Sequence, residues 1–232
     1  MKKLFLSAIV LIAPAISAAQ GYGSGRAQSW DFSFGVIYQQ ADVAAGPGDT
    51  DPGAPQSSLE VDDEFGFGFN VGYHITDHLN VSADFEFLRP DYTAVVVTEA
   101  NPPDGSPPQT ETINHRLNQF NGRLKGTYYF TDGPFVPYVE AGFGWTYVDS
   151  NVASGPPTGF CWWHPWWGYI CESFVDTFSS TETTYGGALG VRYEMPGNSF
   201  IKASYNYWVL VTGSQRADPT LESIRVEYGW RF

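Results

Sequence analysis

Basic residues are scarce in this sequence. Lys and Arg together number 12 against 25 Asp and Glu, which leaves a formal net charge of −13 at pH 7. A nucleic-acid-binding protein needs a basic surface that neutralises phosphates, so this composition argues against nucleic acid as a partner. The acidity therefore excludes one large class of function.

Long apolar segments are also missing after the N-terminus. No stretch beyond residue 19 approaches the roughly 18 consecutive apolar residues that a membrane-spanning helix needs. The one apolar run, residues 4–16, follows Lys2 and Lys3 and precedes three small residues at 17–19. This arrangement is typical of a secretory signal peptide, which we expect at residues 1–19. Residues 20–232 then form one exported domain, and any membrane residence must be through strands.

Aromatic residues (17%) and glycines (25 in number) are abundant, and apolar residues alternate with polar ones. In the C-terminal segment, residues 224–232, every second residue is apolar and Arg225, Glu227, Gly229 and Arg231 lie between them. Such alternation predicts a β-strand with one apolar and one polar face. The same pattern recurs in seven other segments, at 30–40, 65–74, 79–87, 120–130, 138–147, 185–194 and 201–207.

The connections between these segments alternate in length. Tight turns are expected at 76–78, 131–134 and 195–198, whereas the other connections are long and polar. Short periplasmic turns and long extracellular loops are typical of outer-membrane barrels. The sequence therefore predicts an all-β chain, an eight-stranded antiparallel up-and-down transmembrane β-barrel with four long extracellular loops. The run from Tyr92 to Thr98 is interpreted as an extension of the third strand above the membrane.

Three motifs support a family resemblance that covers the whole exported chain. They are Phe-Gly-Phe-Asn-Val-Gly-Tyr at 67–73, Pro-Tyr-Val-Glu-Ala-Gly-Phe-Gly at 137–144, and Tyr-Gly-Trp-Arg-Phe at 228–232. In these motifs the chain resembles the eight-stranded outer-membrane β-barrel family, which includes the OmpA membrane domain, OmpX and the opacity-type porin-like proteins. The periplasmic peptidoglycan-binding domain of OmpA is not expected here, so wall anchoring is not carried over.

The resemblance implies a location in the cell outer membrane of a Gram-negative envelope. It also implies contact with outer-membrane lipid and lipopolysaccharide. In that family the terminal aromatic strand is read by the outer-membrane assembly machinery. On this sequence the corresponding assembly signal is Tyr228, Trp230 and Phe232.

The polar faces of the predicted strands carry six anions and six cations. Equal numbers predict a paired network that fills the lumen, because unpaired buried charge is unfavourable and eight strands leave an interior just wide enough for side chains. The alternative is a gated ion path through charged rings. Glu140 and Arg192, on neighbouring strands, are one expected pair. The predicted network comprises Asp31, Asp84, Glu86, Arg123, Lys125, Glu140, Arg192, Glu194, Lys202, Arg225, Glu227 and Arg231.

The only two cysteines, Cys161 and Cys171, flank a segment with four tryptophans in the third long loop. In an exported protein a disulfide is expected between them. The apolar surface predicts interaction with lipid, a glycan, a partner protein or a host cell surface, and the structural alternative is a self-packed cap over the barrel mouth. A zinc site of Cys161, His164 and Cys171 is a weaker alternative, since it lacks a clear fourth ligand unless Glu172 serves. The tryptophans are Trp162, Trp163, Trp166 and Trp167.

Signals for metal binding and catalysis are weak. The acidic first loop could offer oxygen ligands to a divalent cation, but its Asp49–Gly53 segment lacks the full spacing of an EF-hand, so no metal or cofactor is expected. The histidines show no spacing that resembles a catalytic triad, so no catalytic residues are expected either.

We therefore expect a monomeric outer-membrane β-barrel protein with a structural or surface-interaction role. Envelope integrity, adhesion and binding through the extracellular loops all fall within this interpretation. The alternative is a narrow porin-like channel for ions or small solutes. A lipid-modifying outer-membrane enzyme is a further and weaker alternative.

Overall fold

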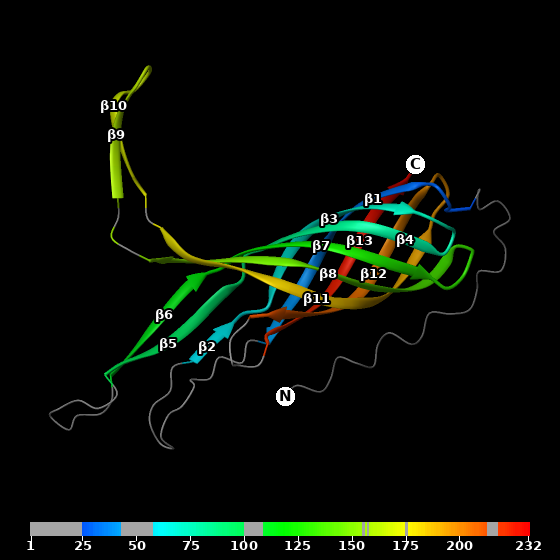
Figure 1. Cartoon of the computed structure of the whole chain (residues 1–232), viewed down its shortest axis with the longest axis horizontal. Helices are drawn as coiled ribbons and strands as arrows, with labels where there is room; N and C mark the ends of the chain where they lie inside the picture. The colour runs from blue at the N-terminus through cyan, green and yellow to red at the C-terminus, as the bar shows by residue number, and fades with distance from the viewer. Residues whose placement is uncertain are drawn as a thin grey trace.

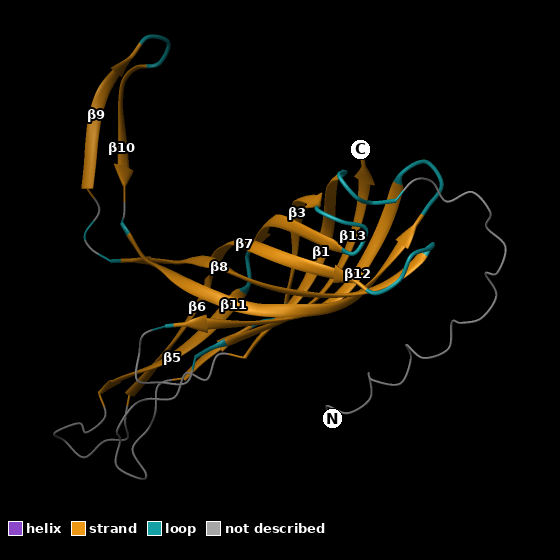
Figure 2. Cartoon of the chain, turned by 45° about the vertical axis from the view of Figure 1, so that its right-hand side comes forward, coloured by secondary structure: helices purple, strands orange, loops and turns teal. Residues whose placement is uncertain are grey.

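The structure is a computed structural model that describes residues 25–42, 58–99, 109–154, 156, 158–174, 176–212 and 218–232. The predicted signal peptide at residues 1–19 and the acidic segment with Asp49 and Asp51 lie outside the described residues. The described residues form strands, turns and loops (Figure 2). They contain no helix long and apolar enough to cross a membrane.

Eight antiparallel strands close into a barrel in the order β1-β13-β12-β11-β8-β7-β4-β3 (Figure 1). This confirms the predicted architecture. The barrel strands are β1 (Trp30–Asp42), β3 (Glu64–His74), β4 (Leu79–Leu88), β7 (Asn118–Tyr129), β8 (Phe135–Ala153), β11 (Thr177–Glu194), β12 (Ser199–Val211) and β13 (Thr220–Arg231).

Burial alternates along the barrel strands, as the sequence pattern predicts, except in the extracellular extensions of β8 and β11. In β12, for example, Ile201 and Tyr205 are exposed whereas Lys202 and Asn206 are buried. The exposed side chains are mainly aromatic and aliphatic, and most of the buried ones are polar or charged. This arrangement is the reverse of a soluble protein and fits a barrel with lipid outside and a polar interior.

The barrel is closed by pairing between the first and last strands. Phe34 of β1 lies opposite Tyr228 of β13, and the terminal Phe232 exchanges two backbone hydrogen bonds with Trp30, at 2.8 and 2.9 Å. The short turns predicted after the second, fourth and sixth barrel strands are confirmed. They lie at the same end of the barrel as the C-terminus, which is the periplasmic end (Figure 1).

The extracellular loops contain strands of their own. β5 (Asp91–Glu99) pairs with β6 (Gln109–Arg116) and with the short β2 (Ser58–Val61) in a separate three-stranded sheet. The interpretation of Tyr92–Thr98 as a continuation of the third barrel strand is therefore wrong. β4 ends at Leu88, and Pro90, which has no backbone N–H to donate, precedes the new sheet.

The third loop forms a two-stranded hairpin of β9 (Thr158–His164) and β10 (Gly168–Phe174). Long extracellular extensions of β8 and β11 lead to it, and Figure 1 shows the hairpin standing apart from the barrel.

Candidate functional site

The barrel interior contains two groups of buried ion pairs, which together we call the network. Eleven of the twelve side chains predicted for it are no more than 7% exposed, and Arg231 is partly buried. They lie on the inner face because each occupies one of the alternating strand positions whose side chains point into the barrel. The network has a central part and a periplasmic part.

The central part is a closed ring of alternating charges. Arg225 lies 2.6 Å from Asp84, 3.1 Å from Glu86 and 2.9 Å from Glu227. The ring then continues from Glu227 to Lys202 (3.6 Å), to Glu140 (2.9 Å), to Lys125 (3.1 Å) and back to Asp84 (3.5 Å). Arg123 joins it through an ion pair with Glu86. Side chains from β4, β7, β8, β12 and β13 thus meet across the lumen.

The suggested pairing of Glu140 with Arg192 is wrong. In the register of β8 and β11, Ala188 lies opposite Glu140, and Arg192 lies opposite Val136. Glu140 therefore pairs with Lys125 and Lys202.

Arg192 belongs to the periplasmic part of the network, where it pairs with Asp31 and Glu194. Arg231 lies 3.9 Å from the same Glu194. The Arg192 guanidinium also lies 3.6 Å from the centre of the Phe200 ring, so its face contacts an aromatic ring while its edge meets carboxylates.

Two members of this part are absent from the predicted set. His74 is fully buried, and its Nε2 lies 2.7 Å from Asp31. It follows Asn70 and Gly72 at every second position of its strand, and this alternation was the signal that could have identified it as inward-facing. Arg26 precedes the first strand, and it donates to the backbone oxygens of Asp77 and Thr131 at the periplasmic turns. No strand alternation covers Arg26, so the sequence carried no comparable signal.

Apolar clusters lie on either side of the central ring. Tyr129, Val136 and Tyr138 pack together near the periplasmic end. Trp208, Leu210 and Leu221 pack together towards the extracellular end. The central ring of charges and the two apolar clusters therefore occupy successive levels of the lumen.

The extracellular hairpin carries the most exposed aromatic surface of the described chain. Trp163, Trp166, Trp167 and Tyr169 are 71, 83, 74 and 69% exposed. The side chain of Trp162 lies outside the described part of the structure. These exposures are inconsistent with a self-packed cap over the barrel mouth.

The hairpin is held by a disulfide between Cys161 and Cys171, which are directly opposite each other in the β9–β10 register. At the tip, the His164 ring lies 4.3 Å from that of Trp167. Because both thiols are in the disulfide, they cannot serve as thiolate ligands, so the zinc alternative fails. Among the described residues no group of three or more His, Cys, Asp or Glu side chains could hold a metal ion.

The predicted assembly signal lies at the end of the last strand and just beyond it. Tyr228, Trp230 and Phe232 are 36, 40 and 72% exposed on the outer face of the barrel. The rings of Tyr228 and Trp230 contact each other edge to face at 4.7 Å.

Comparison with known proteins agrees with this geometry. The sequence model of one family, described as outer membrane protein beta-barrel domain, matches residues 4–232. No curated protein matches the sequence. Among solved structures, the chain is similar to Neisserial surface protein A (TM-score 0.54, 13% identity, covering 88% of this chain and 97% of that one). It is also similar to OprG from Pseudomonas aeruginosa (TM-score 0.52, 13% identity, 90% and 97% coverage).

The chain belongs to the outer membrane protein β-barrel family. It is accordingly a protein of the cell outer membrane.

Proposed function

We propose that this protein is a surface-binding protein whose barrel anchors it in the outer membrane and whose β9–β10 hairpin contacts a partner outside the cell. The observation that carries the proposal is the set of three tryptophans and one tyrosine, each at least 69% exposed, on a disulfide-closed hairpin. On the surface of a soluble protein, a large exposed apolar patch marks an interaction site. The proposed role is binding, without catalysis.

The composition of the hairpin suits a binding surface. Tryptophan and tyrosine supply most of the energy at many protein interfaces, since they offer a large contact area and lose little conformational entropy. The cross-strand pair of Trp163 and Tyr169 and the disulfide both restrict the hairpin before binding. Restriction of this kind lowers the entropic cost of association.

The charge of the chain points to the chemistry of the partner. At −13, the protein repels polyanions and attracts basic surfaces over distances of roughly a Debye length, about 8 Å at physiological salt. Tryptophan faces also bind Lys and Arg side chains through cation–π contacts. We therefore propose a protein partner that presents basic and apolar groups together.

The test uses the mature protein in lipid nanodiscs and measures its binding to cells and to immobilised basic proteins. We expect the double variant Trp166→Ala/Trp167→Ala to weaken binding by about tenfold or more. Phe178→Ala is the matched control, because Phe178 is also a largely exposed aromatic (60%), on the extension of β11 but outside the hairpin. Unchanged binding by the tryptophan variant, or an equal loss in the control, would contradict the proposal.

We further propose that the lumen does not conduct. The closed ring of ion pairs and the apolar clusters on either side support this, because side chains occupy the space that an ion would need. In planar bilayers we expect no stable conductance from the refolded protein. A conductance whose ion selectivity changes in Glu140→Lys would instead favour the porin-like alternative.

A further inference from the structure

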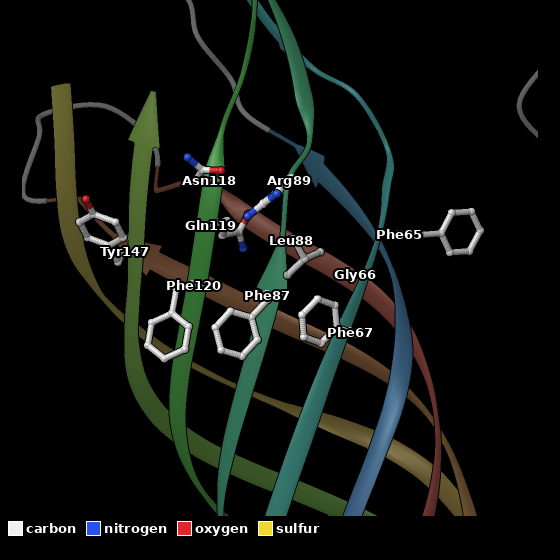
Figure 3. A pocket seen from close by; sticks show the side chains of 10 residues that line it. All are labelled: Phe65, Gly66, Phe67, Phe87, Leu88, Arg89, Asn118, Gln119, Phe120 and Tyr147. Atoms are coloured by element: carbon white, nitrogen blue, oxygen red, sulfur yellow. The ribbon is translucent and has the colours of Figure 1, made fainter. Parts of the chain in front are cut away.

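A groove on the outer face of the barrel is distinct from the hairpin. It has a volume of about 600 Å³ and lies near the extracellular ends of β3, β4 and β7. We call it the rim groove. Figure 3 shows Phe67, Phe87 and Phe120 side by side across neighbouring strands, with Tyr147 higher on the next strand and Arg89 and Asn118 above the row. The aromatic residues of this row are Phe67, Phe87, Phe120 and Tyr147, and Phe65 also lines the groove.

Strand register places the four rings in one row. Phe67 lies opposite Phe87, Phe87 opposite Phe120, and Phe120 opposite Tyr147. The ring centres of Phe67 and Phe87 are 5.3 Å apart, and those of Phe87 and Phe120 are 4.9 Å apart. Phe67, Phe87 and Phe120 therefore form a continuous aromatic band across three strands, and Tyr147 lies in register with Phe120 on the fourth.

The hollow above this row follows from the end of one strand pairing. β3 and β4 pair up to Phe67 and Phe87, but β3 extends to Glu64 at its extracellular end. Beyond the last pair, Gly66 lies close against Leu88, since a Cβ on Gly66 would lie 2.6 Å from Leu88 Cγ. Gly66 and Leu88 thus line the groove.

Arg89 is unusual among the cations of this protein. Of the Lys and Arg residues that the structure describes, it alone has no carboxylate within ion-pair distance. It is exposed, and it lines the groove on the extracellular side of the aromatic row. An unpaired guanidinium in a chain of charge −13 is available to an anion that the rest of the surface would repel.

The position of the groove identifies the anion. The aromatic band faces the membrane, and Arg89 lies above it at the extracellular end, where outer-leaflet headgroups lie. Apolar rings suit an acyl chain, and a guanidinium suits a phosphate because it can donate two parallel hydrogen bonds. We propose that the rim groove binds a phosphorylated acyl lipid of the outer leaflet, with an acyl chain along the aromatic row and its phosphate on Arg89.

Native mass spectrometry of the mature protein in detergent tests this site, with diphosphorylated lipid A as the probe. We expect Arg89→Gln to weaken lipid binding by about tenfold, the loss typical of one charge-assisted contact. Phe87→Ala/Phe120→Ala should weaken it as well. Arg116→Gln is the matched control, since Arg116 is exposed at the same end but pairs with Asp91 at 2.7 Å. It should bind within about twofold of the unmodified protein.

Dephosphorylated lipid A supplies a second readout. It should bind the unmodified protein about tenfold more weakly, and Arg89→Gln should cause no further loss with this lipid. Equal loss in Arg89→Gln and Arg116→Gln would overturn the proposal, as would full binding by Arg89→Gln. Complete competition by millimolar inorganic phosphate would assign the site to a free anion instead. Heat-dependent gel mobility confirms that each variant is folded, and none of these results depends on the hairpin.

Discussion

Replacement of Arg225 by methionine tests whether the lumen is a dry, paired core. Arg225 is 1% exposed and contacts three carboxylates, those of Asp84, Glu86 and Glu227, at 2.6 to 3.1 Å. Methionine fills much of the same volume without charge. The variant therefore leaves these three buried carboxylates with one fewer cation.

The magnitude follows from what each carboxylate retains. Removal of one partner from a buried ion pair costs about 3–5 kcal/mol, because the other charge stays buried without compensation. Here Asp84 keeps Lys125, Glu86 keeps Arg123, and Glu227 keeps Lys202 at 3.6 Å. We therefore expect Arg225→Met to lower the free energy of unfolding by about 3 kcal/mol, the lower end of this range. This loss is a large part of a typical folding free energy of about 5–15 kcal/mol.

Guanidinium unfolding in phospholipid vesicles, followed by tryptophan fluorescence, measures this loss. The charge-balanced variant Arg225→Met/Glu227→Gln should recover at least about 1 kcal/mol, because it removes one of the uncompensated anions. Arg116→Gln, in an exposed pair, should leave the unfolding midpoint unchanged. A cost below about 1 kcal/mol for Arg225→Met would match a solvated ion pair, and it would refute the filled lumen.

Three further predictions concern the backbone, the hairpin and the extracellular sheet. Gly144→Ala should lower the free energy of unfolding by about 1–3 kcal/mol in the same assay, because its Cβ would lie 2.0 Å from the Gly122 carbonyl oxygen. An unchanged unfolding midpoint would contradict this, because it would show that β7 and β8 accommodate the methyl group without loss of stability. Cys161→Ser/Cys171→Ser should speed amide hydrogen exchange in β9 and β10 only, since these strands pair with each other outside the barrel sheet; faster exchange in barrel strands would contradict this. The hydrogen bond from Arg116 lowers the pKa of Asp91 below its usual 3.8, so any stabilisation by this pair is present above pH 3.8 and is lost as the pH falls through the lowered pKa. Titration by NMR should show the pKa of Asp91 rising towards 3.8 in Arg116→Gln, and no rise would exclude Arg116 as the cause.

The loops show where local patterns are insufficient. Tyr92–Thr98 alternates well enough to be identified as extended chain, but the sequence does not say whether such a segment continues a neighbouring strand or starts a new sheet. That choice depends on a partner strand, here β6, and on the break at Pro90. The same applies to the hairpin, whose cysteines predicted a closed loop but not the exposure of its tryptophans.

The sequence by itself determined the eight strands, their two faces, their short turns and the twelve strand-borne charges of the lumen network. These features are local, since the direction of a side chain on a strand depends only on its place in a two-residue repeat. Only the tertiary structure decided which charges pair, because register sets Glu140 against Ala188 and brings it to Lys202, 62 residues away. Only the closed barrel, likewise, brings Arg26 to the periplasmic turns and places Arg89 above an aromatic row drawn from four strands. Contacts between distant segments depend on strand register and closure, which no short stretch of sequence encodes.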